Sequence, residues 1–179
     1  YGDEVRGTDG DYCPNVAGTS TKDRIGCIDS DGDGWSNPDS VWSINLGGDA
    51  FPDDATQHFD GDQDGYGDNA EGNQPDSCPS VFGTSNMDLF GCRDSDGDGW
   101  SDAADAFNND ATQWSDQDGD GYGDETVGNL PDSCPTEFGN STITRYGCVD
   151  SDGDGLDDEL DAFPLDASET IDTDGDGVG

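Results

Sequence analysis

Hydrophobic residues are sparse along this chain, and no segment repeats them with the period of a regular secondary structure. An amphipathic helix would place apolar side chains roughly every 3.6 residues, and a half-buried strand would place them at alternate positions. Glycine and aspartate are abundant throughout, and both disfavour helices and strands. The sequence therefore predicts little regular secondary structure, with at most a short helical turn at 54–57 or 156–160.

The few apolar positions recur in register along the chain. They flank pairs of cysteines or follow aspartate-rich segments. The recurring sets are Ala17, Phe82 and Phe138; Ile25, Phe90 and Tyr146; and Phe51, Phe107 and Phe163. Because each set supplies only a few side chains, we expect small clusters of a disulfide and some aromatic rings, and no single hydrophobic core.

Three tandem repeats explain this register. Each contains two cysteines at the same spacing, here called the cysteine loop, and two aspartate-rich motifs separated by a linker around Ala-Phe and DATQ. The repeats span 1–65, 66–121 and 122–179. Repeat 1 carries an insertion of nine residues near 38–48. We expect the array to begin and to end inside a motif, as a window cut from a longer array.

The cysteines predict a disulfide framework. An even number at regular spacing in a chain with little core is typical of disulfides formed in an oxidising compartment. Zinc is a poor alternative, because no CxxC occurs and His58 is the only histidine. Repeat symmetry leaves pairing within each loop or pairing between loops, and the equal loop lengths favour the first. The predicted pairs are Cys13–Cys27, Cys78–Cys92 and Cys134–Cys148.

Charge restricts the partners further. The chain has 44 Asp+Glu and 5 Lys+Arg, with a formal net charge of −39. This charge repels nucleic acid and anionic membranes, and no apolar run approaches membrane-spanning length. Low hydrophobicity with high charge is usually typical of disorder. Here, however, the acid is mostly aspartate at fixed spacings with glycine, which an ion site requires and a disordered tail does not.

The two aspartate-rich motifs have the spacing of a calcium loop. Motif A follows the cysteine loop and reads DSDGDGW or DSDGDGL, and motif B follows the linker and reads DGDQDGY, DQDGDGY or DTDGDGV. Calcium takes six to eight oxygens; a wrapping loop supplies carboxylates from positions 1, 3 and 5, a carbonyl from 7 and acids at 9 and 12, with glycine at 6. Mg²⁺ prefers a rigid octahedral shell, so the pattern favours calcium.

The spacing assigns the ligands in each repeat. For motif A they are Asp29, Asp31, Asp33, Trp35, Asn37 and either Asp39 or Asp49; Asp94, Asp96, Asp98, Trp100, Asp102 and Asp105; and Asp150, Asp152, Asp154, Leu156, Asp158 and Asp161. For motif B they are Asp60, Asp62, Asp64, Tyr66 and Asp68; Asp116, Asp118, Asp120, Tyr122 and Asp124; and Asp172, Asp174 and Asp176. Position 12 of motif B is Glu71 or Val127, so Asp76 and Asp132 are better candidates to close its shell.

These motifs resemble the thrombospondin type 3 repeats. The DxDxDGxGD string and the Asp-x-Cys-Pro that follows carry the resemblance, which covers essentially the whole chain. It implies calcium-wrapped repeats with little secondary structure, tied by disulfides, in matrix or surface proteins and in large secreted microbial proteins. A Gly-Cys precedes motif A, which differs from the animal pattern and suggests a microbial relative. The flanks lack the helices of EF-hands and dockerins.

The predicted fold is thus an elongated, calcium-threaded and disulfide-pinned repeat array. We expect an extracellular structural stalk or filament segment; the alternative is a calcium-dependent adhesion module with a protein or glycan partner. An enzyme is not expected, because no nucleophile set accompanies the lone His58. The apolar insertion at 38–48 either contacts a partner or packs on its own repeat. Head-to-tail self-assembly would let Asp3 and Asp11 complete a site begun by Asp172 of another copy.

Overall fold

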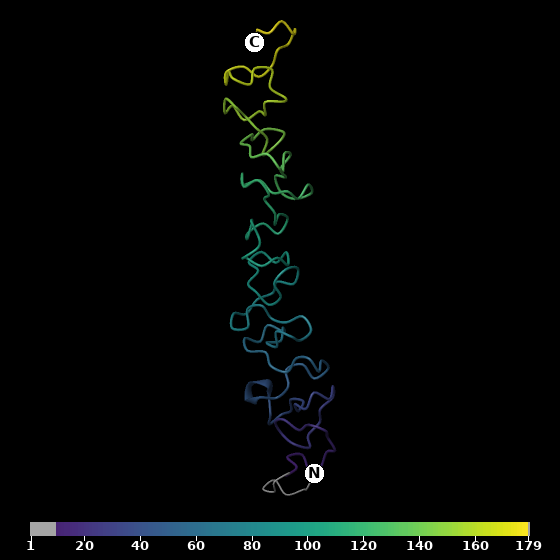
Figure 1. The fold of residues 1–179 in the computed structure, drawn as a ribbon. Coiled ribbons are helices and arrows are strands. Elements are labelled where there is room, and N and C mark those ends of the chain that lie inside the picture. The colour runs from purple at the N-terminus through teal and green to yellow at the C-terminus, as the bar shows by residue number, and fades with distance from the viewer. Residues whose placement is uncertain (1–9, 179) are drawn as a thin grey trace. The chain divides into compact units, whose positions relative to one another are not determined.

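The computed structural model describes residues 10–178, and their backbone is almost entirely turns and bends (Figure 1). Within this range the only helix is η1, a single 3₁₀ turn at Ile44–Leu46 in the insertion of repeat 1. No strand is formed there; β-pairing is limited to isolated bridges such as Gly123 with Pro131. The predicted lack of regular secondary structure is confirmed. At 54–57 the chain makes one hydrogen-bonded turn, from the Gln57 amide to the Asp54 carbonyl at 2.9 Å.

The chain divides into two compact units, Tyr1–Asp94 and Ser95–Gly179. The first holds repeat 1 with the start of repeat 2, and the second holds motif A of repeat 2 from its second residue onward, with repeat 3. No helix among residues 10–178 has the length and apolar character needed to cross a membrane.

All three disulfides join the two ends of a cysteine loop, as predicted. The pairs are Cys13–Cys27, Cys78–Cys92 and Cys134–Cys148, with Cα–Cα distances of 5.0, 5.1 and 5.1 Å. A buried serine at the same place in each loop supports this closure. The amide of Cys27 donates to the Ser20 hydroxyl at 2.8 Å, and the amide of Cys148 donates to Ser141 at 2.9 Å.

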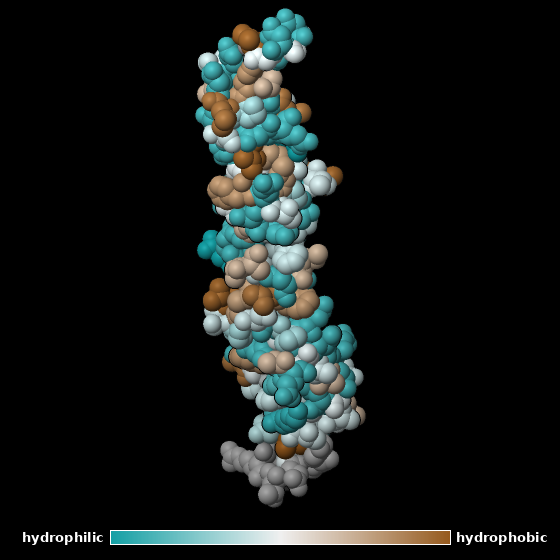
Figure 2. Space-filling model, turned by 45° about the horizontal axis from the view of Figure 1, so that its top comes forward, coloured by the Kyte–Doolittle hydropathy of each residue, from teal (hydrophilic) through white to brown (hydrophobic). Residues whose placement is uncertain are grey.

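The interior of the molecule is polar. The buried hydrophobic residues of the described chain are three cysteines, whereas glutamine, aspartate and serine side chains fill the remaining buried positions. The expected aromatic clusters form only in part. Tyr122 packs on Tyr146 with ring centroids 5.6 Å apart, but Phe82 and Phe138 are 61% and 64% exposed. On the face in Figure 2, hydrophobic side chains form separate brown groups among hydrophilic residues.

Two glutamines are fully buried, and each connects its own linker to the segment that follows motif B. Gln113 donates its side-chain amide to the carbonyls of Glu125 and Asn129, at 3.1 and 3.2 Å, and accepts the Glu125 amide at 2.9 Å. Gln57 makes the equivalent bonds in repeat 1. A side chain at Gly123 or Gly128 would clash with Gln113. The glutamine of DATQ therefore holds the linker and the following segment together, because its side chain satisfies three backbone groups at once.

Loss of one disulfide should cost substantial stability. Replacing both Cys134 and Cys148 with serine releases a loop with a sequence separation of 14, and the chain-entropy model assigns about 3 kcal/mol to a loop of that size. Urea unfolding in saturating calcium measures the free energy of unfolding. An exposed Ser133→Ala variant is the control; a cost under about 1 kcal/mol for the double variant would contradict the entropic account.

Candidate metal centres

The first aspartate of each motif organises its own loop. In motif A of repeat 3, the two oxygens of Asp150 accept the amides of Gly153 and Gly155 at 2.7 and 2.8 Å. Equivalent pairs of bonds are made by Asp29, Asp60, Asp116 and Asp172. The backbone therefore curls around the carboxylate, because two amides converge on its two oxygens.

Positive φ angles at positions 4 and 6 make this curl possible. In repeat 3 they are 81° at Gly153 and 101° at Gly155. Such angles favour glycine, since other residues meet a steric penalty there. The requirement at position 4 was not predicted from the sequence. Gln63 occupies position 4 in motif B of repeat 1, with φ 67°, and its side-chain amide donates to Asn45 at 2.7 Å.

The aspartates at position 3 keep one oxygen free of backbone bonds. At position 5 the same is true of Asp154 in motif A, whereas Asp64 and Asp120 in motif B also accept the amides of Gly83 and Gly139 with their second oxygens, both at 3.1 Å. The Asp31 Oδ1 accepts the Asp33 amide at 3.1 Å, and the Asp33 Oδ1 accepts the Trp35 amide at 2.7 Å. The Asp31 Oδ2 is buried and has no hydrogen-bond partner within the described residues. The same holds for Oδ2 of Asp62, Asp96, Asp118, Asp152 and Asp154. A buried carboxylate oxygen without a donor is costly unless a cation lies beside it.

The three leading carboxylates of a motif converge. In at least five motifs one carboxylate oxygen from each of the three aspartates lies within 4.8 Å of the others. The groups are Asp29, Asp31 and Asp33; Asp60, Asp62 and Asp64; Asp94, Asp96 and Asp98; Asp116, Asp118 and Asp120; and Asp150, Asp152 and Asp154. These clusters could hold a metal ion, since like charges at this separation repel strongly when nothing neutralises them.

The closing aspartate of motif B lies against both the motif and the next disulfide. Asp132 is buried; its Oδ1 accepts the Cys134 amide at 2.7 Å and its Oδ2 has no partner among the described residues. Burial and then the charges of Asp120 and Asp118 raise the pKa of Asp132 to about 6. A side chain at Gly147 would clash with its Oδ1. Both ends of the cysteine loop therefore hold this carboxylate in place.

Asp76 occupies the same place after motif B of repeat 1. It accepts the Cys78 amide at 2.6 Å, and burial, with the charges of Asp64 and Asp62, raises its pKa. Glu71, the alternative at position 12, is exposed and lies outside the cluster. Asp11 accepts the Cys13 amide at 2.7 Å in the same manner. Asp3 falls outside the described residues, so the predicted pairing of Asp3 and Asp11 stays a prediction.

In motif A of repeat 1 the chain returns to the aspartate cluster after the insertion and places Asp49 beside it. Asp49 is 1% exposed, and its Oδ1 accepts the Phe51 amide at 2.8 Å. Its Oδ2 is buried without a partner in the described chain. Burial, followed by the charge of Asp33, raises the pKa of Asp49 to about 6. Asp39, the other candidate, instead pairs with Arg24 at 2.7 Å.

Repeats 2 and 3 place their position-12 aspartates alike. Asp161 is buried and accepts the Phe163 amide at 2.8 Å. Asp105 accepts the Phe107 amide at 2.6 Å, and burial beside other aspartates raises its pKa. The insertion therefore changes the chain length of repeat 1 without changing the closing contact.

The side chain at position 9 accepts the amide of position 2 in motif A and in motif B of repeat 1, whereas Asp124 in motif B of repeat 2 has a different partner. In motif A, both oxygens of Asp158 accept hydrogen bonds from Ser151, at 2.7 and 2.6 Å, and Asn37 contacts Ser30 equivalently. Asp102 likewise accepts two bonds from Ser95. In motif B, Gly61 donates to Asp68, whereas Asp124 accepts from Ser115 and keeps a buried Oδ1 without a partner in the described residues.

The predicted carbonyl ligands lie at the closed end of each loop. Their amides donate to the carboxylate at position 5, as Leu156 does to Asp154 at 2.8 Å. The same bond is made by Trp35, Tyr66, Trp100, Tyr122 and Val178. Coordination by these carbonyls stays a prediction. Asp174 and Asp176, in the last motif, are more exposed than the corresponding residues of the other motifs.

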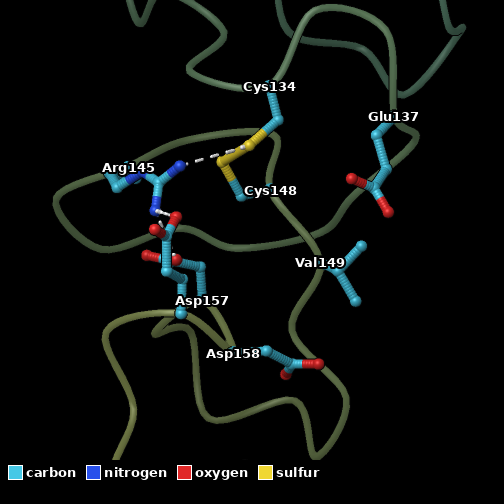
Figure 3. Close-up of a pocket in the computed structure, with 8 residues that line it drawn as sticks. Cys134, Glu137, Arg145, Cys148, Val149, Asp157 and Asp158 are labelled. Carbon is cyan, nitrogen blue, oxygen red and sulfur yellow. Dashed lines mark hydrogen bonds and ion pairs between the residues drawn. A yellow bond between two sulfur atoms is a disulfide. The ribbon is translucent and has the colours of Figure 1, made fainter.

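Asp157 is a buried carboxylate that sequence reasoning missed. It is held by Arg145 at 2.9 Å, beside the Cys134–Cys148 disulfide (Figure 3). In repeat 1 the same position is Ser36, which donates to Asp23 of the cysteine loop through its amide and hydroxyl, at 2.8 and 2.6 Å. Repeat 3 has threonine where repeat 1 has Asp23. Repeat 1 thus has the acid in the cysteine loop and the hydroxyl in motif A, whereas repeat 3 has the reverse. This exchange was the signal for Asp157 that the sequence offered.

The cavity beside the disulfide has diverged between these repeats. In repeat 3 it measures 280 Å³ and is lined by Glu137, Asp157, Asp158 and Glu159 (Figure 3). In repeat 1 it measures 290 Å³ and is mainly apolar, with Val16, Ile28 and Pro38 in its wall. The acidic cavity of repeat 3 already contains a cation, the guanidinium group of Arg145.

Protons should be released when an ion enters these sites near pH 6. A raised carboxyl pKa stabilises the metal-free fold at low pH, and this stabilisation is lost as pH rises through the folded-state pKa. For Asp49 and Asp132, whose pKa values are about 6, metal-free stability should fall as the pH rises from about 4 to about 6. Metal affinity should rise over the same range and level off above about pH 7. At pH 6 about half a proton should leave each carboxyl on binding.

Calorimetric titration in two buffers of different protonation enthalpy measures that release. Asp132→Asn should reduce it, and at pH 8 it should vanish. The exposed Asp53, replaced by asparagine, is the control. Equal proton release at pH 6 and pH 8 would contradict the assignment of these two carboxyls to the sites.

The donors gathered at these sites are carboxylate oxygens, each position set by backbone amides of the same repeat. Such a set suits a hard cation. A comparison with known proteins adds no assignment: no protein-family model matches this sequence, and no curated protein matches it.

Proposed function

We propose that this chain is an extracellular calcium-binding repeat segment, a calcium-stiffened stalk or filament of a surface or secreted protein. The observation that carries the proposal is the set of buried carboxylate oxygens without hydrogen-bond donors, such as Oδ2 of Asp31, Asp49, Asp118 and Asp132. A protein interior of this kind is stable only when cations balance it.

Calcium is favoured over other ions by the chemistry of the donors. They are oxygens, with no histidine nitrogen or free thiol in the described clusters. Zinc and copper would favour nitrogen or sulfur. The donors lie on irregular loops, which suit the variable shell of calcium better than the strict octahedron of magnesium. The resemblance of the motifs to thrombospondin type 3 repeats supports the same ion.

A structural role is supported by the near-identity of the sites. The same amide-to-carboxylate bonds recur from Asp29 to Asp172, and a chain of similar ion sites gives many small stabilising steps along its length. This is how a repeat array with little hydrophobic core can be stiffened. The buried polar residues serve the backbone and the carboxylate clusters, so we do not assign an enzymatic activity.

A calcium-dependent adhesion module is the second candidate, because the insertion of repeat 1 exposes apolar side chains. Val41 and Leu46 are 74% and 58% exposed. Trp42, however, packs on its own repeat: its indole N–H donates to Asp23 at 3.2 Å, and Arg24 lies 5.8 Å from its ring centroid. The packing of Trp42 favours the structural role for the insertion.

The three disulfides favour an oxidising compartment, and we infer an extracellular location. This location also supplies millimolar calcium, in which even weak loops of this kind are occupied.

Sensitised terbium luminescence tests the proposal. Tb³⁺ replaces Ca²⁺ in oxygen sites and emits when a nearby indole or phenol is excited, and Trp35, Tyr66 and Tyr122 occupy position 7 of three motifs. We expect strong emission that calcium displaces at concentrations at least about tenfold lower than magnesium. Emission that is absent, or that magnesium displaces as readily as calcium, would overturn the calcium assignment.

A further inference from the structure

A cavity between two tryptophans has no counterpart of the same chemistry in the neighbouring repeats. It lies within the unit Ser95–Gly179, measures about 440 Å³, and is lined by Trp100, Trp114, Ser115, Asp116 and Glu125 together with two alanines. This volume falls within the range of small-molecule sites. The aspartate clusters do not use the indoles or Glu125.

The two indoles form one continuous aromatic wall. Their rings are nearly parallel, at 13°, with centroids 6.3 Å apart, which is an offset-stacked arrangement. Both residues are half-buried, so each is fixed in place while ring surface stays accessible. The faces of an indole carry partial negative charge and attract cations.

Acidic side chains complete the wall. Glu125 lines the cavity while its backbone amide and carbonyl are held by the buried Gln113, at 2.9 and 3.1 Å. Asp116 lies in the same lining, with its two oxygens accepting the amides of Gly119 and Gly121. The Glu125 backbone is therefore fixed beside the indoles. Asp116 belongs to the metal cluster, so the Glu125 carboxylate is the negative charge of this lining that a bound metal ion does not balance.

The other repeats lack this combination. In repeat 1, His58 takes the place of Trp114 and stacks on Trp35 with centroids 4.6 Å apart. Asn69 takes the place of Glu125, and its amide donates to the Thr56 carbonyl at 2.7 Å, a bond that a carboxylate cannot make. In repeat 3 the ring positions are Leu156 and Thr170. A combination of side chains that occurs in one repeat and not in the others is expected where a specific ligand binds.

We propose that this cavity binds an organic ammonium group, either the side chain of a lysine or a free quaternary amine. Indole faces and carboxylates together recognise such a cation, and the alkyl part gains from contact with the rings. A bare metal ion would find few oxygens along an aromatic wall. A neutral sugar could stack on the rings, but it would gain nothing from the surplus negative charge.

Indole N–H signals in heteronuclear NMR spectra test the proposal in saturating calcium. The probes are choline, for a free quaternary amine, and an acetylated lysine amide, for a protein side chain. We expect the Trp100 and Trp114 signals to shift, with a dissociation constant of roughly millimolar order, while Trp35 and Trp42 stay unchanged as internal controls. Binding of only one probe identifies the source of the ligand and supports the site.

Two variants keep the test specific. Trp114→Thr, which introduces the residue type that repeat 3 has at Thr170, should weaken binding about tenfold, and the isosteric Glu125→Gln should weaken it about threefold. Asn69→Gln, at the position that corresponds to Glu125 after the preceding motif B, should have no effect. The proposal is overturned if neither cation shifts the two signals, if the neutral carbon isostere of choline or glucose binds as well as choline, or if both cavity variants bind normally.

Discussion

Removal of calcium with a chelator is expected to unfold most of the chain while the disulfides stay closed. At a free calcium concentration of one hundred times its dissociation constant, each site adds about 2.7 kcal/mol to the free energy of unfolding. The five aspartate clusters would together contribute more than about 10 kcal/mol. Domains of ordinary stability have about 5–15 kcal/mol in total, and this chain has almost no hydrophobic core to replace the loss.

Amide hydrogen exchange gives the clearest readout of that change. The amides of Gly153, Gly155 and Cys134, each bound to an aspartate oxygen, should be protected in calcium and should exchange at nearly unstructured rates in chelator. Salt alone screens the repulsion among carboxylates, so a chelated sample at matched ionic strength with magnesium is the control. Unchanged protection in chelator would contradict a folding role for the ion.

Asp49→Asn is expected to abolish tight binding at the first motif A of the chain. The substitution removes one of the carboxylates around the ion while keeping the size of the side chain, and affinity in such loops depends on the number of charged ligands. We expect the affinity of this one site to fall by roughly a hundredfold. Distant sites should change little, because repeats are coupled mainly to their neighbours.

Asp39→Asn is the matched control for this experiment. Asp39 lies in the insertion that precedes Asp49 and was the alternative ligand from sequence alone, yet its carboxylate binds Arg24. Terbium emission sensitised by Trp35 follows the affected site selectively. Equal losses in the two variants would show that the insertion acts as a whole and that Asp49 does not close the loop.

Sequence alone was sufficient wherever the chemistry depends on spacing. The disulfide pairs and the lack of secondary structure are confirmed, and the leading aspartates of five motifs do converge. The choice between Asp39 and Asp49 could not be made, because it depends on the path of the insertion. That path turns at η1 and at Gly47, whose φ is 104°.

Sequence reasoning failed where buried polar groups serve the backbone. The repeat pattern places Gln113 only in a linker, because a buried glutamine leaves no periodic pattern; its role appears once its three backbone partners are in place. Asp157 was hidden for a similar reason, since its neighbour Asp158 fits the ligand spacing better. Phe82 and Phe138 are exposed, so these two rings do not join the small aromatic clusters expected beside the disulfides.

The need for glycine at position 4 was also not predicted from the sequence. Calcium-loop reasoning requires glycine at position 6, yet both positions have positive φ here. The second requirement arises from the first aspartate, whose two oxygens must reach two amides on the same turn. Gln63 shows that the backbone tolerates one exception, next to a side-chain contact with the insertion.

Native mass spectrometry of the disulfide-bonded chain at rising calcium concentration counts the ions that the folded aspartate clusters bind. We expect at least five tightly held calcium ions, one for each converging cluster, which magnesium does not replace at equal concentration. A reduced and unfolded sample of the same chain, with the same charge of −39, should hold calcium only weakly and without a preferred number. The same distribution of bound ions in the folded and the unfolded chain would contradict the account.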